Sequence, residues 1–205
     1  MARPPILDQS QSYTFRKYFE LTADPEEIFA ELGIILQKKA LQLPTVANDL
    51  DFLPDLEKRL LQTLELVDLT SEMARRETLI APVLLAVCAQ AHQALKIEYA
   101  IEVNQWLRGT VDYFIPGQQN LLVIEAKQAD LARGFVQLGA ELVALDQWTT
   151  SPTPLLYGAI TTGDVWKFGC LDRTAKTLTQ DIQLYTVPTD LSALVRILSG
   201  IIQGG

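Results

Sequence analysis

Three charged residues, Asp112, Glu125 and Lys127, lie on two neighbouring predicted strands. Asp112 lies within the strand predicted for 107–115, and Glu125 and Lys127 end the nearly continuous apolar run 121–127. The alternation of a strand places residues 125 and 127 on the same face. Burying charges is costly unless they are paired or bind an ion. The residues alone therefore indicate either a structural ion-pair cluster or a cation site, and both interpretations stay open.

The spacing of the two strands predicts how their carboxylates meet. If the hairpin pairs residues whose numbers sum to 237, Asp112 lies opposite Glu125. Directly opposed Cβ atoms in an antiparallel pair are about 5 Å apart. Two carboxylates at that separation repel each other, so one holds a proton or a cation lies between them.

A third carboxylate, Glu77, lies in the predicted helix 71–94. Ile80, Leu84 and Cys88 follow it at positions i+3, i+7 and i+11, which places Glu77 on the stripe that faces the core or the sheet. The alternative is an ordinary charge in an early turn of the helix. Pro82 interrupts this helix and predicts a kink or a new helix start.

The order of these residues resembles the PD-(D/E)XK nuclease superfamily, with its restriction-endonuclease-like fold. The stretch from about 75 to 173 is most similar to the N-terminal nuclease domain of type I restriction motor subunits. The likeness is carried by Glu77 followed by 80–85 (IAPVLL), by 123–127 (VIEAK) followed by Gln137, and by 157–168 (YGAITTGDVWKF). The chain departs from the family pattern at Val111, where the pattern has proline but many members tolerate another residue, and at Glu141, where some branches have tyrosine. It has no Walker loop and hence no ATP motor.

The resemblance implies a site and an activity. Glu77, Asp112 and Glu125 are expected to hold Mg²⁺ or Mn²⁺, which prefer oxygen ligands. Lys127 is expected to hold the attacking water or to stabilise negative charge in the transition state. Gln137 is either part of this site or an ordinary helix residue. The expected activity is hydrolysis of DNA phosphodiester bonds, and the alternative is a non-catalytic or partner-dependent binding or regulatory module.

The elements that must position these residues are predicted from periodicity and capping signals. We expect an α/β fold, a three-layer αβα arrangement with a central mixed sheet, as one domain over 1–205. An N-terminal α+β extension covers 1–70 and a nuclease-like core covers 71–205. Helices are predicted from Pro25 and over 53–67, 71–94, 130–146 and 191–202, and strands over 13–21, 34–41, 97–103, 107–115, 121–127, 155–161, 165–171 and 184–187.

Composition narrows the class of protein. The 205 residues are 48% hydrophobic with a formal net charge of −8, which fits a full-sized core and argues against a general nucleic-acid binder. Residues 1–72 carry 13 acidic and 7 basic side chains, so the acidity is concentrated there. Two cysteines form no disulfide framework, which predicts a cytoplasmic protein, and neither a signal peptide nor a membrane span is expected.

Other side chains have mostly structural interpretations. Cys88 and His92 share a helix face, but too few soft ligands accompany them for a metal site, so core packing is the preferred interpretation. Several arginines could contact phosphate, yet each is more often a solvated surface charge. The sequence leaves open the form of the DNA or RNA substrate, a homodimer, a partner protein, and whether 1–70 is a dimer surface, a lid or additional core.

Overall fold

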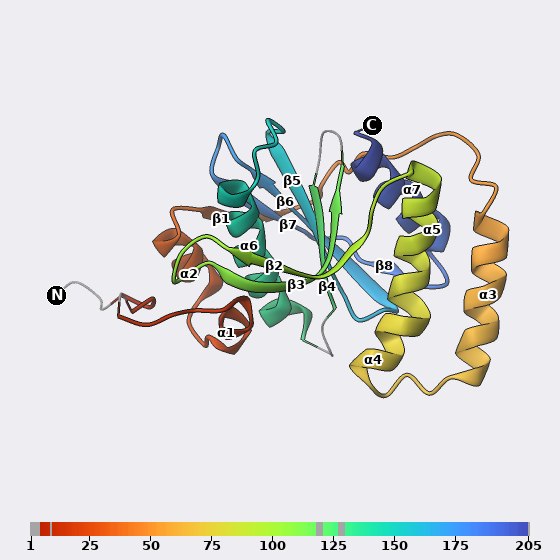
Figure 1. Ribbon diagram of the computed structural model, residues 1–205, viewed down its shortest axis with the longest axis horizontal. Helices are drawn as coiled ribbons and strands as arrows, with labels where there is room; N and C mark the ends of the chain where they lie inside the picture. The colour runs from red at the N-terminus through yellow and green to blue at the C-terminus, as the bar shows by residue number, and fades with distance from the viewer. Residues whose placement is uncertain (1–4, 9, 118–120, 127–129, 205) are drawn as a thin grey trace.

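The computed structural model describes residues 5–8, 10–117, 121–126 and 130–204, and within 121–126 the description covers the backbone. It shows an α/β protein in which a mixed sheet packs against helices (Figure 1). In chain order, the elements are α1 (Phe15–Glu20), α2 (Pro25–Glu31), β1 (Ile35–Lys39), α3 (Leu53–Leu66), α4 (Glu72–Arg75), the π-helical segment η1 (Arg76–Ile80), α5 (Ala81–Ala91), β2 (Lys96–Glu102), β3 (Arg108–Pro116), β4 (Leu121–Ala126), α6 (Leu131–Trp148), β5 (Leu155–Thr161), β6 (Val165–Asp172), β7 (Thr177–Asp181), β8 (Tyr185–Thr186) and α7 (Leu191–Gln203).

The sheet runs in the order β1-β7-β6-β5-β4-β3-β2, and β8 pairs with β6 off this path. The β4–β5 and β1–β7 pairs are parallel, whereas β2–β3, β3–β4, β5–β6 and β6–β7 are antiparallel. Helix α6 makes the crossover between β4 and β5, as a parallel pair requires. The strand that carries Asp112 is therefore flanked by β2 on one side and β4 on the other.

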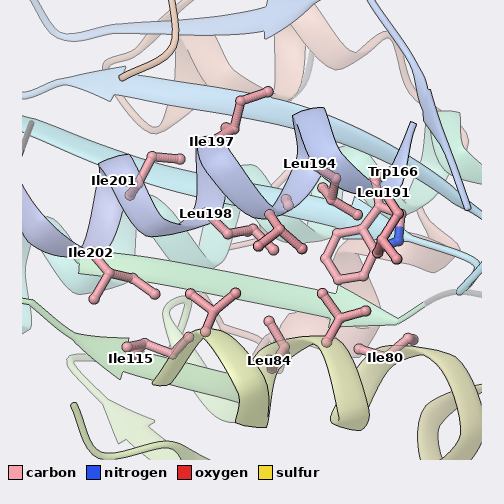
Figure 2. Close-up of a cluster of buried hydrophobic side chains, with 14 of the residues drawn as sticks. Ile80, Leu84, Ile115, Trp166, Leu191, Leu194, Ile197, Leu198, Ile201 and Ile202 are labelled. Carbon is pink, nitrogen blue, oxygen red and sulfur yellow. The ribbon is translucent and has the colours of Figure 1, made fainter. Parts of the chain in front are cut away.

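Two apolar clusters cover the two faces of the sheet. One lies between the sheet and α3, α5 and α7, and the other lies between the sheet and α1, α2 and α6 (Figure 1). Figure 2 shows part of the first cluster, in which Leu84 of α5, Leu198 of α7 and Trp166 of β6 belong to one apolar group. The alternation of β5 divides its residues between the two, with Tyr157 in the first cluster and Leu156 in the second.

Helix starts follow the capping residues that the sequence displays. Asp24 accepts a hydrogen bond from the Glu26 amide at 2.9 Å, with Pro25 in the first position of α2. Ser71 accepts one from the Ala74 amide at 3.0 Å, and Asp130 accepts one from the Arg133 amide at 2.9 Å. The start of α6 just after β4 is therefore fixed by its own cap.

The structure differs from the sequence expectation at two elements, the segment 13–21 and strand β7. The strand predicted over 13–21 is wrong: an isolated bridge joins Thr14 to Arg108, and a short helix follows. The expected new helix start at Pro82 is confirmed, because Pro82 lies in the first turn of α5, which begins after a π-helical segment. The sequence did not predict β7, whose Thr179, Gln180 and Asp181 are buried polar residues.

Among the helices in the described part of the chain, none is long and apolar enough to cross a membrane. Cys88 and Cys170 are both buried and free. His92 does not pack in the core as expected, because it is exposed and ends α5 with a φ of 51°.

Candidate functional site

A pocket of about 730 Å³ opens beside β3 and contains Asp112. Its walls come from the short helices α1 and α4, from α6, and from the β2–β3 pair. Four carboxylates and one arginine are among the lining residues, so the pocket is acidic. The lining residues are Thr14, Phe15, Arg16, Phe19, Glu20, Glu72, Glu98, Gly109, Thr110, Asp112 and Gln137.

The close approach of α1 to β3 shapes this pocket. Gly109 has a φ of 144°, and a Cβ atom built on it would lie 2.9 Å from the Phe15 ring and 3.2 Å from the Phe15 backbone nitrogen. Phe15 is fully buried. The N-terminal segment therefore lies directly against the strand that leads to Asp112, and it forms one wall of the pocket.

The strand register confirms the predicted pairing of β3 with β4. Tyr113 pairs with Ile124 and Phe114 with Val123, and both pairs sum to 237. Asp112 and Glu125 come one position beyond the last of these pairs. On its other side, β4 places Glu125 in register with Ile160 of β5. Positions 112 and 125 are thus neighbours across the two strands. The structure describes the backbone of Glu125 but not its side chain.

On the opposite side of β3, the register brings a further acidic residue to Asp112. Ile97 pairs with Tyr113 and Tyr99 pairs with Val111, so residue 98 faces residue 112 between these two pairs. Glu98 has a φ of 51°, which is unusual for a residue with a side chain. Positions 98, 112 and 125 therefore form one row across β2, β3 and β4.

Arg76, the first residue of η1, connects two members of this row. Its guanidinium lies 2.7 Å from a Glu98 carboxylate oxygen and 3.7 Å from Asp112 Oδ1. It also lies over the Tyr113 ring, 5.2 Å from the centroid. Burial acts to lower the pKa of Arg76, but hydrogen bonds to Tyr113 and Glu98 and the charge of Asp112 outweigh it and raise that pKa. Arg76 is therefore charged at any physiological pH.

Tyr113 reflects the electrostatics around this network. Burial raises the pKa of the Tyr113 hydroxyl, and the charges of Asp112 and Glu77 raise it further, while Arg76 acts in the opposite direction. The hydroxyl is thus neutral near pH 7. Two carboxylates and one guanidinium therefore act on this one hydroxyl in the middle of β3.

Gln137 contributes a buried amide to the same pocket. Its side chain is only 4% exposed, and its Nε2 donates to Glu141 Oε1 at 3.0 Å. Among the described residues, its Oε1 has no hydrogen-bond partner. A buried amide oxygen without a partner is unfavourable, so this atom is suited to accept a hydrogen bond or to bind a cation.

The structure does not place Glu77 in the pocket with Asp112. Glu77 is exposed in η1 and lines a different pocket with Arg59, Thr63, Thr78, Pro82 and Leu85. The expected core-facing orientation of Glu77 is wrong, because the wider turn of the π-helical segment breaks the 3.6-residue period on which it rested. Lys127 lies outside the described residues.

Within the described part of the chain, no group of three or more His, Cys, Asp or Glu side chains is placed to hold a metal ion. A three-carboxylate site at Asp112 therefore requires the side chain of Glu125. The donors that the structure does place there are carboxylate and amide oxygens, which fit Mg²⁺ or Mn²⁺ in chemical type.

Sequence reasoning missed Arg76 and Glu98. In the sequence, Arg76 is one of several arginines that could contact phosphate, and Glu98 is a polar residue in an alternating strand. The signal that could have found Glu98 is the β2–β3 register, because the pairs on either side of positions 98 and 112 both sum to 210. Comparisons with protein-family models and with curated proteins find no match to this chain.

Proposed function

We propose that the chain is a metal-dependent nuclease that hydrolyses DNA phosphodiester bonds at the row of acidic residues on β3 and β4. The observation that carries the proposal is the β3–β4 register: its last pair is Tyr113 with Ile124, so Asp112 and Glu125 come next on the two strands, and Asp112 lines a pocket with Gln137. The mixed sheet with the α6 crossover supports the restriction-endonuclease-like fold that the sequence resemblance implies.

The residues of the chain have distinct proposed roles. Asp112 and Glu125 hold Mg²⁺ or Mn²⁺; the resemblance implies Glu77 as a third carboxylate, although Glu77 lines a different pocket. When bound, such an ion lowers the pKa of a coordinated water and offsets phosphate charge. Lys127 orients the attacking water or stabilises the negative charge that develops on the phosphate. Gln137 offers its Oε1, which has no hydrogen-bond partner among the described residues, to water or to the cation.

A cleavage assay tests this proposal directly. Purified protein is incubated with plasmid, linear duplex and single-stranded DNA in Mg²⁺, in Mn²⁺ and in EDTA. The test variant is Glu125→Ala/Lys127→Ala. The matched control is Glu57→Ala/Lys58→Ala, which removes two opposite charges from the exposed face of α3.

The proposal predicts cutting that requires the metal, disappears in the test variant and persists in the control. Metal-dependent cutting by Glu125→Ala/Lys127→Ala at the wild-type rate would refute the assignment of the site. The three DNA forms identify the substrate if cutting occurs.

The second candidate is a binding or regulatory module that retains the fold and the ion without turnover. The observation in its favour is Arg76, whose charge already lies against Asp112 and Glu98. A ligand at 100 times its Kd stabilises the folded state by about 2.7 kcal/mol. For a chain of this size, that corresponds to a rise in Tm of roughly 5–10 °C. Such a rise in Mn²⁺, without DNA cutting, would favour this module.

A further inference from the structure

Glu98 is one of three acidic residues, with Glu20 and Glu72, that line the pocket beside Asp112 and have no role in the proposed site. It faces Asp112 across the β2–β3 pair, and both side chains line the same pocket. A single guanidinium, that of Arg76, reaches both carboxylates. Two carboxylates that share one cationic group lie close enough to share another.

The buried amide of Gln137 indicates independently that this pocket takes a ligand. It lines the pocket with Asp112 and Glu98, is only 4% exposed, and has no hydrogen-bond partner for Oε1 among the described residues. An oxygen buried in this way loses its hydration and gains nothing in return unless a cation or a bound water meets it. A hard cation held by carboxylates would satisfy that oxygen directly or through one of its waters.

We infer that Glu98 is a further ligand of the divalent cation, next to Asp112, and that Arg76 is the counter-ion that the cation displaces from these two carboxylates. The inference rests on the proposed metal site and deepens it, because it assigns the third carboxylate to Glu98 of β2 in place of Glu77 of η1. Arg76 then neutralises Glu98 and Asp112 in the absence of the cation and limits their mutual repulsion.

The test measures Mn²⁺ binding itself, by calorimetric titration and by the loss of the free Mn²⁺ signal in electron paramagnetic resonance. The variants are Glu98→Gln, Glu77→Gln and Arg76→Gln. The matched control is Glu102→Gln, the same change on the same strand, at a residue that pairs with Arg108 at 3.2 Å. Melting curves without metal identify any variant that is poorly folded.

We expect Glu98→Gln to weaken Mn²⁺ binding at least tenfold, while Glu77→Gln and Glu102→Gln remain within twofold of the wild type. Arg76→Gln should tighten binding about three- to tenfold, because the two carboxylates lose their internal counter-ion. This second variant keeps Glu98 intact, so it tests the same inference in the opposite direction if Glu98→Gln folds poorly.

Wild-type affinity in Glu98→Gln would overturn the inference, and so would weaker binding in Glu77→Gln alone. Unchanged or weaker binding in Arg76→Gln would overturn the role of Arg76. Failure of the proposed function has a different signature: Mn²⁺ binding that depends on Glu98, without cutting of any DNA form, leaves the ligand assignment standing and removes the nuclease. DNA cutting that survives Glu98→Gln, with unchanged Mn²⁺ affinity, overturns the assignment of Glu98 as a ligand and leaves the nuclease proposal standing.

Discussion

Replacing Gly109 by alanine should destabilise the fold at the pocket wall. Gly109 has a φ of 144°, and the new Cβ would lie 2.9 Å from the Phe15 ring. That region of φ is nearly restricted to glycine and costs a residue with a side chain about 1–3 kcal/mol. Overpacking against a buried ring costs a further ~1–3 kcal/mol. The lower entropy of the unfolded alanine chain offsets roughly 0.4–1 kcal/mol of this.

The expected net loss in the free energy of unfolding is about 2–4 kcal/mol, which lowers Tm by roughly 5–15 °C in a chain of this size. Urea unfolding and thermal melts measure it. The matched control is Gly33→Ala, since Gly33 has a φ of 73° but a Cβ atom added to it would meet nothing within 4 Å. The control should lose only the conformational part, about 1 kcal/mol.

The difference between the two alanine variants reports the contact of α1 with β3 together with the larger backbone strain at Gly109. If Gly109→Ala were no more destabilising than Gly33→Ala, Phe15 would not lie against Gly109, and the pocket wall described above would be wrong. A fall in unfolding cooperativity in Gly109→Ala alone would indicate that α1 detaches before the rest of the molecule unfolds.

Three further predictions concern other parts of the chain. Ser199→Ala should raise the free energy of unfolding in urea by up to about 1 kcal/mol, because the buried Ser199 hydroxyl has no partner among the described residues. A fall in the free energy of unfolding by more than about 1 kcal/mol would instead reveal a hydrogen bond of this hydroxyl. Burial acts to raise the pKa of Asp146, but Lys176 and Arg173 outweigh it and lower that pKa. Asp146→Asn should therefore lower Tm at pH 7, and this loss of Tm should shrink as the pH falls below about 4. A loss of Tm that is independent of pH would contradict this prediction. Burial raises the pKa of Cys170 to about 12, so at pH 8 its alkylation in the native protein should be on the order of a thousandfold slower than in urea, and comparable rates would show that the thiol is accessible.

Local signals predicted the elements around the site well. Asp24 and Asp130 cap the helices that the sequence expected them to start. The sum of 237 for β3 and β4 could be predicted because the apolar run of β4 leaves little freedom in the register.

The failures have tertiary causes. The alternation of residues 13–21 suggested a strand, but Phe15 and Tyr18 are buried three positions apart, as one face of a short helix requires. Tyr18 also donates its hydroxyl to the Trp106 carbonyl at 2.8 Å, a contact across 88 residues that local periodicity cannot show. Strand β7 was missed because neighbouring strands bury its polar residues, so its composition carries little apolar signal.

For the candidate site, the sequence predicted the row of positions 112 and 125 but not its extension to Glu98. Glu98 lies in an ordinary alternating strand, and only the pairing of β2 with β3 brings it opposite Asp112. Glu77 was expected in the site because a regular helix was assumed, and one π-helical segment changes which residues face the sheet.

The pairing of β1 with β7 has a consequence for synthesis of the chain on the ribosome. Gln37 of β1 donates to Thr179 of β7 at 2.8 Å, so the hydrogen-bonded partners are 142 residues apart. The ribosome adds about 5–20 residues per second, so β7 is made roughly 7–30 s after β1. During that interval the exposed edge of β1 is open to other chains. We therefore expect a nascent chain that stops before β7 to be far more prone to aggregation than the finished protein.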